Sequence, residues 1–340
     1  MLKINMFSTA DKVKGQGVGS AYDELMAMLK QHFTKEFKIT VNNYGRADIS
    51  HYHTINPSFY LSTFSKKRGR KIGYVHFIPE TLEGSLKIPQ PFKAIFYKYV
   101  IAFYKRMDHI VVVNPSFIPK LEKYGIPADK ITYIPNFVSP TEFYPTDKQH
   151  KAELRVTHGY SQDRFTILGS GQIQTRKGVL DFIDLAKRNP TIQFIWTGGF
   201  SFGKITEGYS ELEKVVKDPP SNLSFPGIID RQKMVDYYNL ADLFLLPSYN
   251  ELFPMSVLEA FATNTPVMLR DLDLYKSIID GYYLPAKDVN EMNDQLLGLI
   301  HDQAKLDELK QVTRQASQRY SESHLAKVWY EFYTQQAREG

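Results

Sequence analysis

Short apolar segments alternate with helical segments in both halves of the chain, and this pattern restricts the fold more than any other feature of the sequence. The first strand is predicted at Leu2–Met6, and a glycine-rich loop leads from it to a helix over Ala21–Phe33. Such alternation is typical of parallel sheets covered by helices, so the expected fold class is α/β. The other predicted strands are Ile39–Val41, Ile72–His76, His109–Val113, Thr166–Gly169, Phe194–Thr197 and Leu243–Leu246.

The chain has 340 residues, which is too long for one ordinary core and suits two domains. We expect two Rossmann-like, doubly wound domains that face a central cleft at the carboxyl ends of their sheets. The polar segment 147–162 lacks an apolar period and is predicted to link a first domain of residues 1–146 to a second of residues 163–321. The final segment, 322–340, carries large apolar residues at helical spacing, and we expect it to cross back onto the first domain.

Composition excludes several classes of chemistry. The chain has no cysteine, so disulfides, thiolate nucleophiles and cysteine-based zinc sites are ruled out. No run of 18 apolar residues predicts a membrane span, and the N-terminal residues do not have the pattern of a signal peptide. We therefore expect a cytoplasmic protein.

Two glutamates follow the predicted strand Leu243–Leu246. Glu251 precedes a predicted helix whose free N–H groups and dipole favour a diphosphate or a sugar oxygen. Glu259 lies about two turns along that helix, where it could accept two hydrogen bonds from a ribose diol. On spacing alone, an equally good alternative is that Glu251 caps the helix and Glu259 is a solvated surface residue.

Glycine-rich loops follow the first strand of each half. The segment Gly169–Gly178 reads GSGQIQTRKG, and its glycines would let the backbone approach a phosphate while Lys177 supplies charge. The loop around Gly17 could equally be a plain tight turn. His76 ends a predicted strand and would point into the cleft, although an isolated histidine there is by default a structural residue.

Together these segments resemble the signature of glycosyltransferase family 4, a retaining family of the GT-B fold. In that family a strand ending in Pro-Ser leads to two glutamates separated by seven residues, as Pro247-Ser248 leads here to Glu251 and Glu259. The hinge motif Ile-Pro-Asn-Gly-Val corresponds to Ile134–Val138, with phenylalanine in place of glycine. The chain departs from the family at 252–254, where Leu-Phe-Pro replaces the usual glycines, so the backbone there has one N–H fewer and less room for close approach.

The resemblance implies roles for individual residues. His76 would contact the donor sugar near the reacting carbon, Glu251 would approach that sugar, and Lys177 would neutralise the leaving diphosphate. The family's usual arginine is Gln172 here, and we expect Arg176 to compensate in part. No metal and no cofactor is expected, because Asp271-Leu-Asp273 lies in a loop where the family binds sugar without metal. The implied donor-binding residues are Gly17, Gln172, Arg176, Lys177, Ile229, Phe253, Pro254, Met255 and Glu259.

Basic residues are concentrated in the first half. The run at 66–71 contains five of them, and because burying such a run is implausible, it favours an anionic membrane surface over nucleic acid as the partner. The predicted helix around Phe92–Arg106 has an aromatic face bordered by lysines, which is typical of interfacial helices, although packing on the sheet would explain that face equally well. The expected acceptor or membrane residues are His53, Lys66, Lys67, Arg68, Lys93, Phe96 and Lys98.

The opening segment Ile4–Ala21 resembles one branch of the family, from low-GC Gram-positive bacteria. That branch makes diglycosyl-diacylglycerol, the lipoteichoic acid anchor, by adding a hexose to α-glucosyl-diacylglycerol. The resemblance implies UDP-galactose or UDP-glucose as donor, a glycolipid acceptor, and peripheral attachment to the inner face of the cell membrane. Two alternatives stay open: a soluble relative acting on a polysaccharide or teichoic acid, and a catalytically silent nucleotide-sugar-binding protein.

Overall fold

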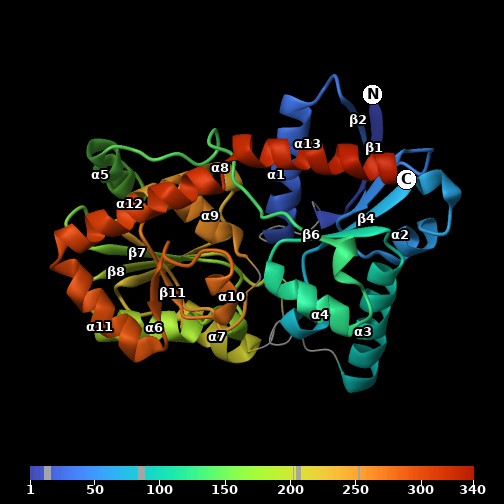
Figure 1. Cartoon of the computed structure of the whole chain (residues 1–340). Coiled ribbons are helices and arrows are strands. Elements are labelled where there is room, and N and C mark those ends of the chain that lie inside the picture. Colours follow the sequence, from blue (N-terminus) through green and yellow to red (C-terminus); the bar gives the residue numbers. More distant parts are fainter. Residues whose placement is uncertain (11–16, 83–88, 202, 204–207, 252) are drawn as a thin grey trace.

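The computed structural model describes residues 1–10, 17–82, 89–201, 203, 208–251 and 253–340, and it contains two parallel six-stranded sheets (Figure 1). The strand order is β2-β1-β3-β4-β5-β6 in the first sheet and β12-β11-β10-β7-β8-β9 in the second. The two-domain, doubly wound α/β prediction is confirmed. The strands are β1 (Leu2–Phe7), β2 (Phe37–Val41), β3 (Ile49–Tyr52), β4 (Arg70–Val75), β5 (His109–Val112), β6 (Ile131–Tyr133), β7 (Thr166–Ser170), β8 (Gln193–Thr197), β9 (Leu223–Gly227), β10 (Leu243–Leu246), β11 (Val267–Arg270) and β12 (Leu284–Ala286).

The central strands are mostly buried because helices cover both faces of each sheet. All four residues of β10 are buried, and Phe244 pairs with Val267 on one side and Leu168 on the other. The helices are α1 (Gly17–His32), α2 (Pro57–Ser62), α3 (Gln90–Lys105), α4 (Ile118–Lys123), α5 (Lys148–Thr157), α6 (Val179–Arg188), α7 (Tyr209–Lys217), α8 (Arg231–Leu240), α9 (Met255–Ala262), α10 (Asp273–Lys276), α11 (Val289–Ile300), α12 (Gln303–Arg319) and α13 (Glu322–Glu339).

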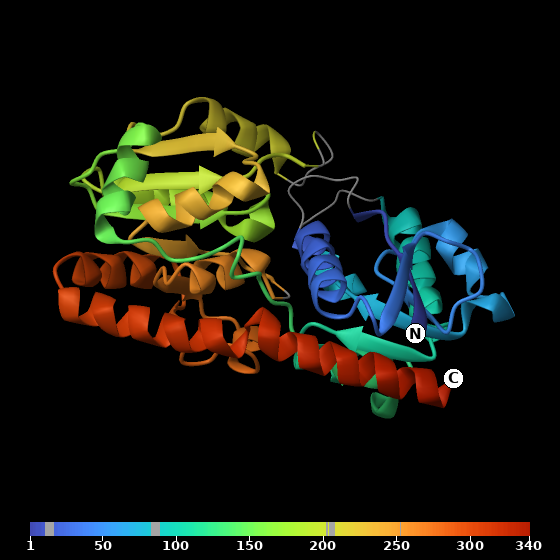
Figure 2. The same ribbon diagram turned by 90° about the horizontal axis from the view of Figure 1, so that it is seen from above.

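The first sheet has a separate core on each face. On one face, α1 and α13 pack over residues such as Ile4 and Ile72. On the other, α2, α3 and α4 enclose Phe7, Val75 and Val112. The helix α13 leaves the second domain and runs along the first, as Figures 1 and 2 show, which confirms the predicted crossing.

The predicted linker, 147–162, is not a linker. It contains α5, whose first turn is capped by the Asp147 carboxylate, an acceptor for the His150 N–H at 2.8 Å. Arg155 is buried and donates to the carboxylate of Asp242 at 2.6 Å, which attaches α5 to the second domain. The sequence has no apolar period here because an ion pair, rather than an apolar face, holds much of this helix in place.

Two segments of the chain connect the domains, and these two segments are in contact. Val138, in the predicted hinge, forms an isolated parallel bridge with Ser321, which precedes α13. The carboxyl ends of the two sheets also meet, because the Asn114 amide after β5 donates to the carbonyl of Leu274 after β11 at 3.3 Å. Among the residues that the structure describes, none of the helices has both the length and the hydropathy needed to cross a bilayer.

Candidate functional site

Two loops of the second sheet bring Lys177, Arg176 and Glu251 together. Gly178 makes this possible: it has a φ of 68°, and a Cβ there would collide with the Pro247 carbonyl. The loop after β7 therefore lies directly against the loop after β10. Lys177 donates to Oε1 of Glu251, and Nη1 of Arg176 lies 3.5 Å from Oε2.

This cluster is almost fully buried. Glu251 is 6% exposed, and burial alone would raise the pKa of its carboxyl, but the charges of Lys177 and Arg176 outweigh burial and hold the pKa below its usual range. Glu251 is therefore ionised and paired. The alternative that it caps the next helix is wrong, because Pro254 occupies the N-cap of α9 and the Glu251 carboxylate bonds to Lys177.

Glu259 lies two turns into α9 and is also buried, so the alternative of a solvated surface residue is wrong as well. Its Oε1 accepts from Nη1 of Arg231 at 3.0 Å, and its Oε2 accepts from the Tyr238 hydroxyl at 2.7 Å. Each carboxylate oxygen has two lone pairs, so an acceptor site remains on each. Arg231 and Tyr238 were missed by the sequence reasoning, and the one local signal was the position of Arg231 at the start of the helix after β9.

The other residues that were predicted to bind the donor lie in several elements. Gln172 accepts a hydrogen bond from Gln174 at 2.6 Å, whereas Arg176 lies beside Lys177, where a compensating cation would be needed. The Phe253 side chain packs against the ring of Tyr320 at 5.1 Å, so only its backbone could face a donor. Gly17 begins α1, Met255 begins α9 and Ile229 follows β9, while Gly15 and Leu252 lie outside the described residues.

Three histidines line the carboxyl ends of β3 and β4. The rings of His51 and His53 lie 4.2 Å apart and those of His53 and His76 5.9 Å apart. Burial lowers the pKa of His51 and His76 to about 3, so these imidazoles are neutral at pH 7. Neither nitrogen of His53, nor Nε2 of His76, is hydrogen-bonded to any residue that the structure describes, so these atoms could bind a hydroxyl. Within the described residues, no group of three or more His, Cys, Asp or Glu is arranged to hold a metal ion.

The basic run at 66–71 is mostly committed to structure, which corrects the expectation that it faces a membrane. Arg68 is 1% exposed and donates to the carbonyls of residues 43–45, so its charge is used inside the fold. Arg70 pairs with Glu339 and Lys71 with Asp108. Lys66 and Lys67 alone in this run are exposed.

The two halves of helix α3 differ in burial. Its C-terminal half packs on the sheet through Val100 and Phe103, whereas its N-terminal half leaves Phe92 and Ile95 each 65% exposed. Lys98 is exposed, and Lys93 and Phe96 are half-buried. The segment of α2 adds two exposed apolar side chains that the sequence reasoning missed, Leu61 and Phe64. We call Leu61, Phe64, Phe92 and Ile95 the α2–α3 apolar set.

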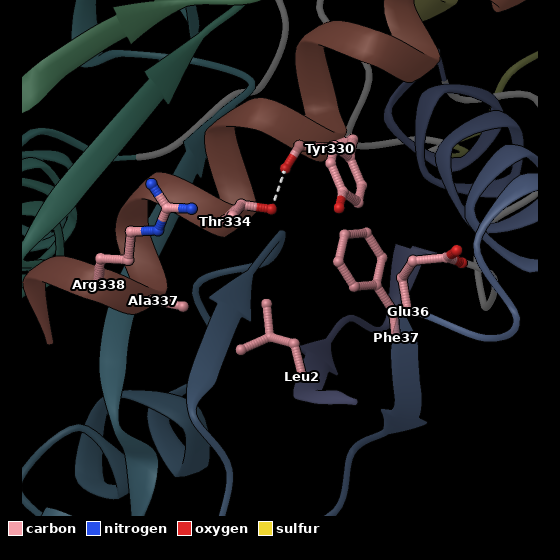
Figure 3. A pocket seen from close by; sticks show the side chains of 7 residues that line it. All are labelled: Leu2, Glu36, Phe37, Tyr330, Thr334, Ala337 and Arg338. Carbon is pink, nitrogen blue, oxygen red and sulfur yellow. Dashed lines mark hydrogen bonds between the residues drawn. The ribbon is translucent and has the colours of Figure 1, made fainter.

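A separate hollow of about 360 Å³ lies between α13 and the first strands, lined by Leu2, Glu36, Phe37, Tyr330, Thr334, Ala337 and Arg338 (Figure 3). It lies at the amino ends of β1 and β2, opposite the end that holds the histidines. Ligands of open α/β sheets bind at the carboxyl ends of the strands, so this hollow is not the candidate site.

The chain is similar to known glycosyltransferases. The chain matches the profile of glycosyltransferase family 4 over residues 22–142 and that of glycosyl transferases group 1 over residues 150–318. Over all 340 residues it is 51% identical to the alpha-galactosylglucosyldiacylglycerol synthase of Streptococcus pneumoniae (strain ATCC BAA-255 / R6), of which it covers 91%. It is 28% identical over 182 residues to the processive diacylglycerol alpha-glucosyltransferase of Acholeplasma laidlawii, a match that covers 53% of each chain.

Solved structures share the fold. A sucrose-phosphate synthase from Thermosynechococcus elongatus aligns over 100% of both chains with a TM-score of 0.81 and 16% identity. Alr3699/HepE of Anabaena, solved in complex with UDP-glucose, aligns over 98% of this chain and 100% of its own, with a TM-score of 0.79 and 15% identity. The chain therefore belongs to glycosyltransferase family 4 and is a glycosyltransferase of the GT-B fold.

Proposed function

We propose that this protein transfers a hexose, galactose in the first instance, from a UDP-sugar to α-glucosyl-diacylglycerol with retention of anomeric configuration. The observation that carries the proposal is the buried Lys177–Glu251–Arg176 cluster at the carboxyl end of the second sheet. The choice of acceptor is supported by the identity of 51% to a protein named alpha-galactosylglucosyldiacylglycerol synthase.

The donor binds to the second domain. The ribose diol donates to the two free acceptor sites on Glu259, whose carboxylate Arg231 and Tyr238 already orient. Lys177 and Arg176 lie where the diphosphate leaves, and their charge stabilises the negative charge that develops on it. Glu251 holds the two cations in place before the donor arrives.

The reaction exchanges one C–O bond for another on the same face of the sugar. The bond from the anomeric carbon to the β-phosphate oxygen breaks, and the acceptor hydroxyl oxygen bonds to that carbon. The hydroxyl proton passes to a leaving-phosphate oxygen. The neutral imidazole of His76 contacts the donor sugar near the reacting carbon, and His53 lines the acceptor side.

The first domain rests on the membrane that holds the acceptor. The α2–α3 apolar set enters the interface while the exposed lysines 66, 67 and 98 meet anionic headgroups. Each basic residue at such a surface contributes about 1 kcal/mol, so these three contribute roughly 3 kcal/mol, enough for reversible attachment. Arg68 takes no part, because it is buried.

The test is transfer from UDP-galactose or UDP-glucose to vesicles that contain glucosyl-diacylglycerol, with product mass and anomeric configuration as readouts. We expect an α-linked diglycosyl lipid, no transfer to soluble glucosides, and loss of transfer in Lys177→Ala. The matched control is Lys187→Ala, which changes an exposed lysine of the neighbouring α6. Transfer to soluble acceptors alone would favour the polysaccharide alternative, and UDP binding without turnover would favour the silent binding protein.

A further inference from the structure

A single arginine joins three carboxylates from three parts of the chain. Arg231, the first residue of α8, donates through Nε to Glu142 at 2.7 Å, through Nη1 to Glu259 at 3.0 Å, and through Nη2 to Glu24. Glu24 lies on α1 of the first domain, Glu142 on the segment that joins the domains, and Glu259 on α9 of the second. Figure 1 shows α1, α8 and α9 gathered where the two domains meet.

The link to the first domain is buried. Glu24 is 3% exposed, and its second oxygen accepts from the backbone N–H of Ser139 in the passage between the domains at 3.0 Å. The Arg231 guanidinium also lies 5.0 Å from the centre of the Phe143 ring. The guanidinium is therefore fixed by contacts with both domains and with the segment between them.

Arg231 orients the carboxylate of Glu259. The Arg231 guanidinium holds Oε1 of Glu259 at 3.0 Å while the Tyr238 hydroxyl holds Oε2, and these two contacts fix the plane of a buried carboxylate. A carboxylate held in one orientation can accept from both ribose hydroxyls at once, and loss of that orientation weakens this pairing. Lysine cannot replace arginine fully, because a single ammonium does not present the planar fork that reaches three carboxylates at once.

We propose that Arg231 is a positioning residue that sets Glu259 for the nucleotide ribose and, through Glu24, couples nucleotide binding to docking of the two domains. This inference rests on the proposed function, since it takes Glu259 as the ribose acceptor. By linkage, whatever the domain contact adds to nucleotide affinity, the nucleotide adds to the domain contact. The ion pairs form a bridge whose centre is the same guanidinium that orients the binding carboxylate.

Calorimetric titration with UDP and with 2′-deoxy-UDP at pH 8 tests both parts. For the wild type we expect UDP to bind at least about tenfold tighter than 2′-deoxy-UDP, because a hydrogen bond to a charged group is lost. Arg231→Lys should reduce this ratio to below about threefold. Glu24→Gln should leave the ratio in place and weaken UDP binding by at least about fivefold, the lower end of typical coupling.

Two further variants provide an independent probe of Glu259 and a matched control. Tyr238→Phe removes the hydroxyl that holds the other oxygen of Glu259 and should reduce the UDP to 2′-deoxy-UDP ratio even if Arg231→Lys folds poorly. Arg155→Lys changes an arginine that pairs with Asp242 in the same domain, away from the site, and should alter neither quantity.

An unchanged ratio in Arg231→Lys and Tyr238→Phe would overturn the positioning role, and wild-type UDP affinity in Glu24→Gln would overturn the coupling. Either result with normal sugar transfer leaves the proposed function standing. A wild type that binds no UDP would overturn the proposed function and this inference together.

Discussion

Replacing Lys177 by methionine separates the structural role of the Lys177–Glu251 pair from its role in transfer. The substitution leaves the Glu251 carboxylate buried, with Arg176 at 3.5 Å as its remaining cation. Removing one partner of a buried ion pair costs about 3–5 kcal/mol, and because Arg176 still compensates in part, we expect a loss near 3 kcal/mol. The same change removes a cation from the leaving diphosphate, which should lower kcat/KM by about 10²–10³-fold.

The double variant Lys177→Met/Glu251→Gln gives the sharper result. Removing both charges leaves no unpaired carboxylate, so stability should return to within about 1 kcal/mol of the wild type. Transfer should not return, because the Lys177 ammonium is still absent and Arg176 is the one cation of this cluster that remains beside the diphosphate. Stability is measured by urea unfolding followed by fluorescence, and activity by transfer from the UDP-sugar to glucosyl-diacylglycerol vesicles.

A matched control exists in the same domain, where Lys151 and Arg155 hold the carboxylate of Asp242 in a second lysine–carboxylate–arginine group. Lys151→Met should lower stability and leave transfer unchanged. If the double variant regained both stability and activity, Lys177 would have no catalytic role and the reasoning would fail.

Four other outcomes follow from the structure. Gly178→Ala should cost at least about 2 kcal/mol more than Gly159→Ala in urea unfolding, because both positions have positive φ but only the first would collide with a carbonyl. Phe92→Ser/Ile95→Ser should weaken co-sedimentation with anionic vesicles about tenfold or more and leave UDP affinity unchanged; loss of both would refute a purely interfacial role. Arg68→Lys should lower the free energy of unfolding by about 2–4 kcal/mol without affecting vesicle binding. Lys66→Gln/Lys67→Gln should weaken vesicle binding and leave the free energy of unfolding unchanged. Burial raises the pKa of Glu24 to about 7, so the folded state retains a proton that the unfolded chain loses near pH 4.5. The free energy of unfolding should therefore fall by at most about 3 kcal/mol between pH 4.5 and 7 because of Glu24. Glu24→Gln should remove this pH dependence, which urea unfolding measured across the range would show.

Much of the fold follows from local patterns. The strand predicted at Ile72–His76 is β4, Arg70–Val75, and the one predicted at Leu243–Leu246 is β10 with the same bounds. These strands are buried on both faces, so their apolar character is continuous and visible in a short window of sequence. The segment 147–162 was misread because α5 is attached by ion pairs rather than by an apolar face.

One part of the candidate site could be predicted from the sequence and another part could not. Lys177 and Glu251 each follow a strand of one sheet, and the carboxyl ends of parallel strands meet at one edge, so their proximity follows from the strand pattern and the family signature. The surroundings of Glu259 do not follow from any local pattern. Arg231 and Tyr238 reach it from α8, and Glu24 reaches Arg231 from more than 200 positions away.

The sequence by itself determined the α/β architecture, the two domains, the crossing of the last helix and the strand ends that carry His76, Lys177 and Glu251. The tertiary structure decided which charged side chains are free and which are bound. Arg68 reads as one more cation in a basic run, but the carbonyls of residues 43–45 surround it once β3 and β4 are paired. Arg231 likewise acquires the carboxylate of Glu24 only when the first domain meets the second. A charge can be buried when folding supplies partners from distant segments, and no local pattern records those partners.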